Sequence, residues 1–340
     1  DNNPVDAEEE EEEEEIDYLD IVSLYPFVMK YRPFPTGVPR VLTGDQLHAQ
    51  QQPMPWTSPG DNPFCGFLLC RVLPPTPAEL GERHTLLPFR TRGGRLTFPL
   101  CALCAELGNA DGRAKQHPQR QCPRALPRCR HVEQQRAWTH AYTHVELNAA
   151  LALGYRVLTL YEVWHYDAWA SLEAGNSLFA NYVDTLLRLK VEASGWPADC
   201  ATAEQRARFV ADYAQREGIH IDAQQVQANP GMRAVVKTLL NALWGKLAQR
   251  AERDDICYTG SAREFHELLL DPRQDVVDFV HINKQLDRCV VRLRHPFVRG
   301  PATNNLAVAC FVTAHARVYL HARLEEVRAL SFRLRQPHSS

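Results

Sequence analysis

The most complete structural signal in this 340-residue chain is a helix over residues 229–247. Asn229 is a residue type that caps helix N-termini, and Pro230 follows at the first helical position, where a missing N–H does no harm. Apolar side chains then recur with i, i+3, i+4, i+7 spacing, at positions 232, 235, 236, 239, 240, 243, 244 and 247. This stripe predicts an amphipathic helix that packs one face against the rest of the protein.

The rest of the sequence mixes strand and helix patterns, which predicts a mixed α/β chain of the α+β kind. A buried strand is expected to end near Asp20, followed by a turn and a helix that the next prolines stop. The pattern of residues 33–63, rich in Pro, Gln and Gly, predicts a loop. The other expected elements are strands in 65–75, 85–90 and 156–166, helices in 145–155, 171–247 and 304–327, and short strands with a helix in 254–298.

Charge is distributed unevenly along the chain, although the net charge is only −3. Residues 1–15 hold ten acidic side chains and no basic one, so we expect a disordered acidic tail. The remainder carries 38 basic against 31 acidic side chains, which suits a polyanionic partner, ordinary surface charge being the alternative. No apolar run approaches the ~18 residues that a membrane span needs, so no membrane partner is expected.

Two groups of residues carry candidate chemistry. Arg233, Lys237, Asn241 and Gly245 are spaced by four and form a row beside the apolar stripe of their helix. Such a row can contact a phosphate chain, or it is a solvated helix face. Asp20, at the end of its strand, can ligate magnesium, or it caps the following turn.

These segments carry a resemblance to family B DNA polymerases. DIVSLYP (20–26) resembles their motif A, D-x-x-S-L-Y-P, and KTLLNALWG (237–245) resembles their motif B, K-x-x-x-N-S-x-Y-G. Further segments resemble the protein-primed branch, most closely the Polinton/Maverick transposon polymerases: CRHVEQQRAW, GYRVLTLYEVWHY, VEASGWP, NPGMR, LWGK and NNLAVACFVTAHAR. The resemblance extends over about residues 16–323.

The resemblance implies a right-hand fold with an antiparallel palm sheet, helical fingers and an insertion subdomain. It also implies an activity, the template-dependent addition of deoxynucleotides to a primer 3′-hydroxyl by two-magnesium transfer. Asp20 would be one of two catalytic carboxylates, with the Ile21 carbonyl as a further magnesium ligand. The residues that would bind the incoming nucleotide are Ser23, Leu24, Tyr25, Lys190, Lys237, Asn241 and Gly245.

The chain also departs from the pattern of these polymerases. Ala242 replaces the motif B Ser, and Trp244 replaces the common Tyr. Motif C, Y-x-D-T-D-S, which supplies the second carboxylate, has no counterpart, because the chain contains no D-x-D triplet. The exonuclease domain expected before motif A is missing too, and the chain opens on Asp1. We therefore expect a fragment, a degenerate copy or a mispredicted gene model that polymerises poorly alone. The alternative function is an inactive remnant that binds nucleotide or DNA.

A second candidate site lies between the two motifs. Cys101-x-x-Cys104 and Cys129-x-His131 are two close ligand pairs with zinc-like spacing, and Cys122 could replace one ligand. The sequence predicts a structural zinc here, free cysteines being the alternative. The nearby basic residues suit phosphate contact, or they belong to a solvated loop: Arg113, Lys115, Arg120, Arg124, Arg128 and Arg130.

We expect the chain to divide into six parts: the tail 1–15, a palm start with motif A (16–60), an insertion (61–165), fingers with motif B (166–250), a second palm part (251–323) and a divergent tail (324–340). The implied partners are a DNA primer–template, deoxynucleoside triphosphates and a terminal priming protein. The implied compartment is intracellular, and nuclear if the host is eukaryotic.

Overall fold

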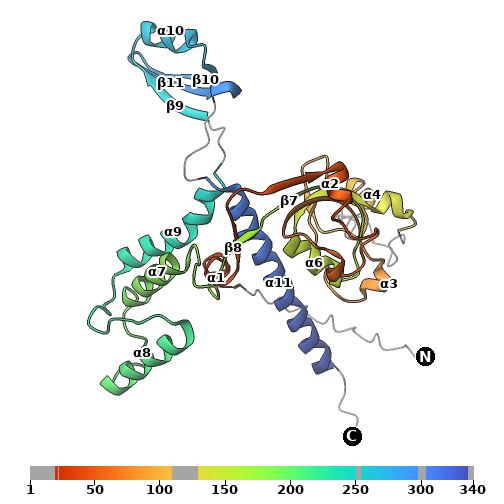
Figure 1. The fold of residues 1–340 in the computed structure, drawn as a ribbon. Helices are drawn as coiled ribbons and strands as arrows, with labels where there is room; N and C mark the ends of the chain where they lie inside the picture. Colours follow the sequence, from red (N-terminus) through yellow and green to blue (C-terminus); the bar gives the residue numbers. More distant parts are fainter. Residues whose placement is uncertain (1–19, 22, 109–128, 250–253, 298–303, 336–340) are drawn as a thin grey trace, which may run out of the picture.

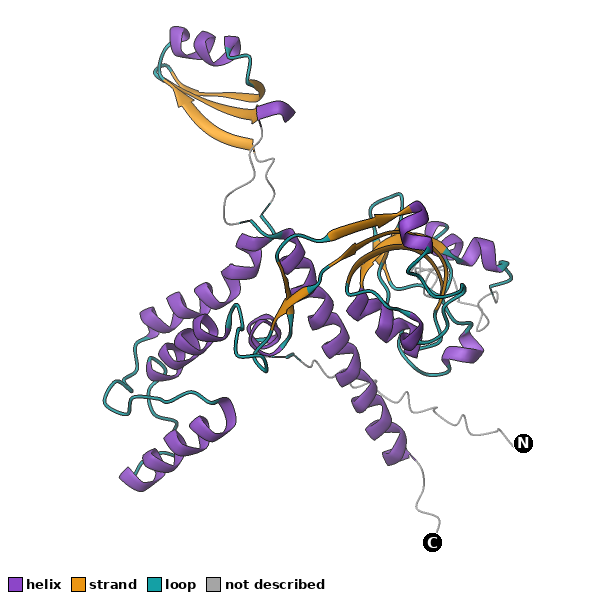
Figure 2. Cartoon of the chain, in the orientation of Figure 1, coloured by secondary structure: helices purple, strands orange, loops and turns teal. Residues whose placement is uncertain are grey.

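The computed structural model describes residues 20–21, 23–108, 129–249, 254–297 and 304–335. Helices and antiparallel sheets are both present (Figure 2), and every strand pairing among these residues is antiparallel. The expected α+β class is therefore confirmed. None of the described helices combines the length and the apolar character that crossing a membrane would need.

A four-stranded sheet organises the part of the chain on the right of Figure 1. Its strand order is β2 (Arg40–Thr43), β7 (Arg156–His165), β3 (Gly66–Leu73), β6 (Trp138–Thr143). Side chains alternate along β3 between buried and partly exposed, as a strand with one covered face requires. The buried face forms the largest core together with α2 (Gly44–His48) and α6 (His144–Ala152).

Helix α6 begins where β6 ends because Thr143 and Glu146 form a capping box. The Thr143 hydroxyl accepts from the Glu146 amide, and the Glu146 carboxylate accepts from the Thr143 amide. The buried Glu146 also pairs with Arg317 of α11 (Leu306–Arg335). One carboxylate therefore fixes the helix start and joins the sheet module to α11.

A second core lies where four helices pack together: α1 (Leu24–Tyr31), α7 (Ala180–Glu192), α9 (Pro230–Leu247) and α11. Val28, Met29 and Phe311 are fully buried in it or nearly so. The long helix α11 runs through the middle of the molecule, between α1 and the sheet module (Figure 1). Helix α8 (Ala203–Glu217) lies beyond α7.

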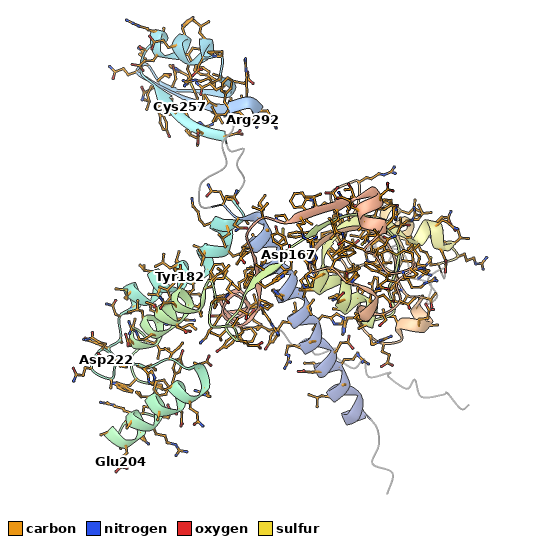
Figure 3. All side chains as sticks on the ribbon, viewed as in Figure 1. Asp167, Tyr182, Glu204, Asp222, Cys257 and Arg292 are labelled. Atoms are coloured by element: carbon orange, nitrogen blue, oxygen red, sulfur yellow. The ribbon has the colours of Figure 1, made fainter. Side chains whose placement is uncertain are left out.

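A third unit combines three strands and a helix and stands apart at the top of Figure 1. It contains β9 (Asp254–Thr259), α10 (Ala262–Leu270), β10 (Gln274–Asn283) and β11 (Leu286–Leu293), in the sheet order β10-β11-β9. Phe265 of α10 packs on Phe279 of β10, with ring centroids 4.8 Å apart. Figure 3 labels Cys257 and Arg292 in this sheet.

Smaller elements complete the description. Strand β1 (Phe34–Thr36) pairs with β8 (Ala168–Ala170), and β4 (Phe89–Arg90) pairs with β5 (Leu96–Thr97). The remaining helical pieces are α3 (Pro77–Leu80), α4 (Ala102–Glu106), α5 (Glu133–Arg136), η1 (Pro59–Asp61) and η2 (His295–Phe297).

Most expected elements are confirmed, with three differences. The predicted loop 33–63 contains β1, β2 and α2, and β2 joins the sheet that β3, β6 and β7 form. The helix expected over 304–327 continues to Arg335. The expected strand in 85–90 is reduced to its last two residues, β4.

The apolar stripe of α9 is a further expectation that needs correction, since only part of it is buried. The Asn229 side chain caps α9 as predicted, by accepting from the Met232 amide at 3.0 Å. Val236 and Leu240 are buried, whereas Val235 is 56% exposed. Helix α9 packs mainly against α7, with smaller contacts to α11 and α1.

Several predictions fall outside the described residues. These are the acidic tail 1–15, the strand before Asp20, Cys122, and the basic residues Arg113, Lys115, Arg120, Arg124 and Arg128. Arg130 is described, and it is exposed.

Candidate functional site

The motif A segment forms a turn that leads into helix α1. Asp20 is exposed at its start, and Ile21 is partly exposed. Ser23 adopts a left-handed conformation, with φ 58° and ψ 35°, which is uncommon for a residue other than glycine. The first N–H groups of an α-helix have no acceptor within the helix, so the turn presents main-chain donors at the N-terminus of α1. Leu24 is the first residue of that helix.

Motif A and motif B meet through two aromatic side chains. Tyr25 of α1 and Trp244 of α9 have ring centroids 5.0 Å apart, with ring planes inclined by 50°. The Trp244 indole N–H donates to the Ala309 carbonyl of α11 at 3.1 Å. Helices α1, α9 and α11 are therefore joined at one point, and the two motifs, more than 200 residues apart in the sequence, lie side by side.

Three cationic side chains gather on helices α7 and α9. Arg233 and Lys237 both lower the pKa of Lys190, although burial of the Lys190 ammonium is the larger cause of that shift. Lys190 stands near the end of α7, and the other two lie one turn apart on α9. None of the three forms an ion pair with a carboxylate in the part of the chain that the structure describes. This cluster, called the cationic cluster below, can bind a polyanion.

Helix α7 and helix α9 are held together around this cluster. The Arg233 guanidinium donates to the Ser194 hydroxyl at 3.1 Å, and that hydroxyl donates to the Lys190 carbonyl at 2.7 Å. Tyr182, labelled in Figure 3, donates its hydroxyl to the Leu239 carbonyl at 3.0 Å. The positive charges are thus supported by a paired helix scaffold.

Asn241 and Gly245 continue the same row toward motif A. Both are exposed, and a Cβ atom built on Gly245 would have no heavy atom within 4 Å, apart from its chain neighbours and its own helix. Packing within the chain therefore does not explain the glycine. An open, side-chain-free position on this face would let a ligand approach the helix closely.

The residues around Asp20 do not fit a two-magnesium centre. Such a centre needs at least two carboxylates around the ions. In the described part of the chain, the one cluster of three or more His, Cys, Asp or Glu side chains with metal-binding geometry does not include Asp20. We therefore derive no catalytic step through magnesium for this chain.

That one cluster is the Cys and His group predicted from the sequence. The ligand atoms of Cys101, Cys104, Cys129 and His131 all lie within 4.8 Å of one another. The His131 Nδ1 atom is 3.3 Å from the sulfurs of Cys101 and Cys104, and 3.5 Å from that of Cys129. Ligands of a tetrahedral zinc, at ~2.3 Å for sulfur and ~2.0 Å for nitrogen, are about 3.5 Å apart. The group could hold a metal ion of that size.

The three thiols of this cluster influence one another. Burial is the main reason that the pKa of Cys104 rises to about 12, with its hydrogen bonds to the other two thiols adding to the rise. The pKa of Cys129 is lowered, because hydrogen bonds from the His131 amide and from the other two thiols outweigh its burial. Three thiolates this close would repel one another, and a shared metal cation would offset that repulsion as the thiols release their protons.

One group that links α1 to α7 and α8 was not predicted from the sequence. Lys30 of α1 is 4% exposed, and it contacts Asp184 of α7 and the Glu217 carbonyl at the end of α8. Nothing in the sequence around position 30 indicates which residues contact this lysine, because its partners lie more than 150 residues away. An apolar helix that carries a single lysine is the pattern that could have drawn attention to it.

Comparison with protein families gives one match. A family model described as DNA polymerase type B, organellar and viral, matches residues 3–107. This part of the chain is similar to type B DNA polymerases. The matched segment contains motif A, Cys101 and Cys104, and it ends before motif B. No curated protein and no solved structure matches the chain.

The family match supports a DNA-directed DNA polymerase function in general terms. It also implies the partners of that function, a DNA template–primer and deoxynucleoside triphosphates. The matched segment covers less than a third of the chain.

Proposed function

We propose that the chain is the palm-and-fingers portion of a protein-primed family B DNA polymerase of the Polinton/Maverick type. The observation that carries the proposal is the contact between Tyr25 and Trp244, which brings the helix after motif A against the motif B helix. Residues that a polymerase uses on one nucleotide are thereby on neighbouring helices. The family match over residues 3–107 supports the same reading from the sequence.

In this proposal the cationic cluster holds the triphosphate of the incoming deoxynucleotide. Lys190 and Lys237, together with Arg233, supply positive charge that no carboxylate neutralises in the part of the chain described. Charged hydrogen bonds to phosphate are about twice as strong as neutral ones. The amides of Ser23 and Leu24 would add main-chain donors from the N-terminus of α1.

The sugar and the base would lie between the two motifs. Tyr25 would contact the deoxyribose, and its ring is fixed from the side by Trp244. Lys237 and Trp244 are seven residues apart, which is about 10 Å along α9. Asn241 and Gly245 lie on the exposed face of this stretch, where they would run along the nascent base pair.

The second candidate, a binding protein without catalysis, is favoured by the setting of Asp20. This carboxylate is exposed and has no second carboxylate in a metal-binding group within the described residues. We therefore propose that this chain, by itself, binds nucleotide and primer–template and incorporates poorly or not at all.

Primer extension and nucleotide binding, measured on the same preparation, test both candidates. We expect dATP to bind in the presence of magnesium and a dideoxy-terminated primer–template, and to bind at least tenfold more weakly to Lys237→Ala. Incorporation that is abolished by Asp20→Ala would favour the active polymerase over the binding protein. Absence of nucleotide binding by the unaltered chain would rule out both.

We further propose that Cys101, Cys104, Cys129 and His131 hold a structural zinc ion. The distances between their ligand atoms support this choice. The ion would join α4 to the segment before α5, which closes the intervening part of the insertion into a loop. In protein-primed polymerases this insertion would face DNA and the terminal priming protein, and Arg130 is an exposed cation suited to phosphate contact there.

A further inference from the structure

One buried cation joins the helix after motif A to two helices of the fingers. The Lys30 ammonium lies 2.6 Å from a carboxylate oxygen of Asp184 in α7 and donates to the Glu217 main-chain carbonyl of α8 at 2.7 Å. The Lys30 side chain is 5% exposed and the Asp184 side chain 32%, so the ammonium is almost out of water while the carboxylate is partly exposed. Lys30, Asp184 and Glu217 are called the lysine joint below.

The contact with α8 satisfies a helix end. Glu217 is the last residue of α8, and the last four carbonyls of a helix have no N–H partner within it. Gly218 then reverses the chain in the left-handed conformation, at φ 70°. A cation at this end also meets the negative pole of the helix dipole. Lys30 therefore acts as a cap for α8 that is supplied by a helix far away in the sequence.

The fingers helices are also tied to one another. The buried Glu192, at the end of α7, accepts from the Asp222 amide in the connection after α8 at 2.9 Å (Asp222 is labelled in Figure 3). Its carbonyl accepts from the Gln227 amide at 3.0 Å, just before α9. Helices α7, α8 and α9 therefore form one unit, and the lysine joint fixes this unit to α1.

The joint is close to the groups that would bind nucleotide. Asp184 and Lys190 are six residues apart on α7, which is about 9 Å along the helix. A methionine would fill the volume of Lys30 without the penalty of burying an ammonium. Apolar packing, however, fixes no direction, whereas an ion pair to α7 combined with a hydrogen bond to α8 does. A lysine here is thus explained better by orientation than by stability.

From this geometry, and resting on the proposed function, we propose that Lys30 is a positioning residue that sets the fingers against motif A for nucleotide binding. It touches no substrate itself. Through Asp184 and Glu217 it holds the cationic cluster at the distance from Tyr25 that a deoxynucleoside triphosphate spans. Loss of the joint lets the fingers unit turn away from α1, which weakens nucleotide binding and leaves duplex binding in place.

The test measures dATP affinity, with magnesium and a dideoxy-terminated primer–template, for the unaltered chain and for Lys30→Met, Asp184→Asn and the double variant. The control is Lys284→Met, which makes the same change at an exposed lysine between β10 and β11. We expect each single variant to bind dATP at least tenfold more weakly and the double variant to be no worse than either. Affinity for the primer–template alone should stay within about twofold, and the control should match the unaltered chain.

The alternatives give different results. Equal losses of dATP and primer–template affinity would reveal general misfolding and overturn the positioning role. Unchanged dATP affinity would also overturn it, whether or not the melting temperature of the variant changes. If Lys30→Met does not fold, Asp184→Asn, which keeps shape and removes charge, decides by the same criteria. Failure of the unaltered chain to bind dATP would instead overturn the proposed function and, with it, this inference.

Hydrogen exchange provides a readout that does not depend on nucleotide. The Gly218 amide donates to the Ala214 carbonyl at the end of α8. We expect this amide to exchange faster in Lys30→Met than in Lys284→Met, because α8 loses its cap. Equal exchange in the two variants would contradict the lysine joint itself.

Discussion

Trp244 connects three helices through one side chain, and it stands where the resembled polymerases commonly have a tyrosine. Its ring contacts Tyr25, and its indole N–H donates to Ala309 of α11. The structure therefore accommodates this departure from the motif: the larger ring fills the space between α1 and α9, and its N–H is satisfied.

Gly245, the next residue, is the position where substitution distinguishes folding from binding most clearly. Gly245→Ala should stabilise the protein and weaken its binding. Alanine in a helix interior is favoured over glycine by about 1 kcal/mol, and the added methyl group meets no atom within 4 Å outside its own stretch of helix. The denaturant midpoint should therefore rise. If the row lies along the nascent base pair, the same methyl group should reduce dATP affinity on primer–template severalfold. Unchanged affinity would remove Gly245 from the proposed site.

His315 should make stability depend on pH. Burial lowers its pKa to about 4, and its ring nitrogen contacts the Pro33 carbonyl at 3.0 Å. The unfolded chain takes up this proton near pH 6.5 and the folded chain only near 4, so the contribution of His315 to the free energy of unfolding should be constant above pH 6.5. It should fall by on the order of 3 kcal/mol between pH 6.5 and 4. His315→Gln should flatten that part of the curve in urea titrations; an unchanged slope would contradict this origin.

At the scale of elements, the sheet module depends on a close approach between two strands. Gly66 of β3 has φ 155°, and a Cβ atom there would lie 1.8 Å from the Trp164 carbonyl oxygen of β7. Gly66→Ala should therefore destabilise the protein by at least about 2 kcal/mol, since the backbone must move. Comparison of its denaturant midpoint with that of Gly245→Ala provides a matched pair. A stabilised Gly66→Ala protein would show that the register of β3 and β7 is wrong.

The zinc proposal also belongs to this scale, because the ion would hold α4 to the segment before α5. Purified protein should contain about one zinc ion per chain by elemental analysis, and Cys101→Ser should lose it. Cys200→Ser is the matched control, since Cys200 is also buried and lies outside the cluster. Affinity should fall with falling pH, because the thiols must release protons. No zinc in protein prepared without chelator would support free cysteines.

Elements with a strong local signal could be predicted from the sequence, whereas those defined by distant partners could not. Asn229 and Pro230 predicted where α9 begins, and the alternation of residues 156–166 predicted β7. The short strands β1 and β2 lie in a Pro-rich stretch and exist because β8 and β7 pair with them. The partners of Lys30 were hidden for the same reason, since nothing near residue 30 encodes a contact to α7 or α8.

The whole molecule raises the question whether motif A and motif B act on one ligand. The order of the motifs could be read from the sequence, and the structure adds that α1 and α9 touch and that Lys190 lies near Lys237. In the described region Asp20 belongs to no group of three or more side chains that could hold a metal ion, so binding chemistry is better supported than catalysis.

Photoaffinity labelling with 8-azido-dATP, followed by peptide mapping, tests the shared site most directly. We expect the label to reach peptides from both α1 and α9, unlabelled dATP to compete with it, and Lys237→Ala to reduce labelling at both places. Labelling of one helix alone, or of peptides from neither, would contradict a single nucleotide site between the two motifs.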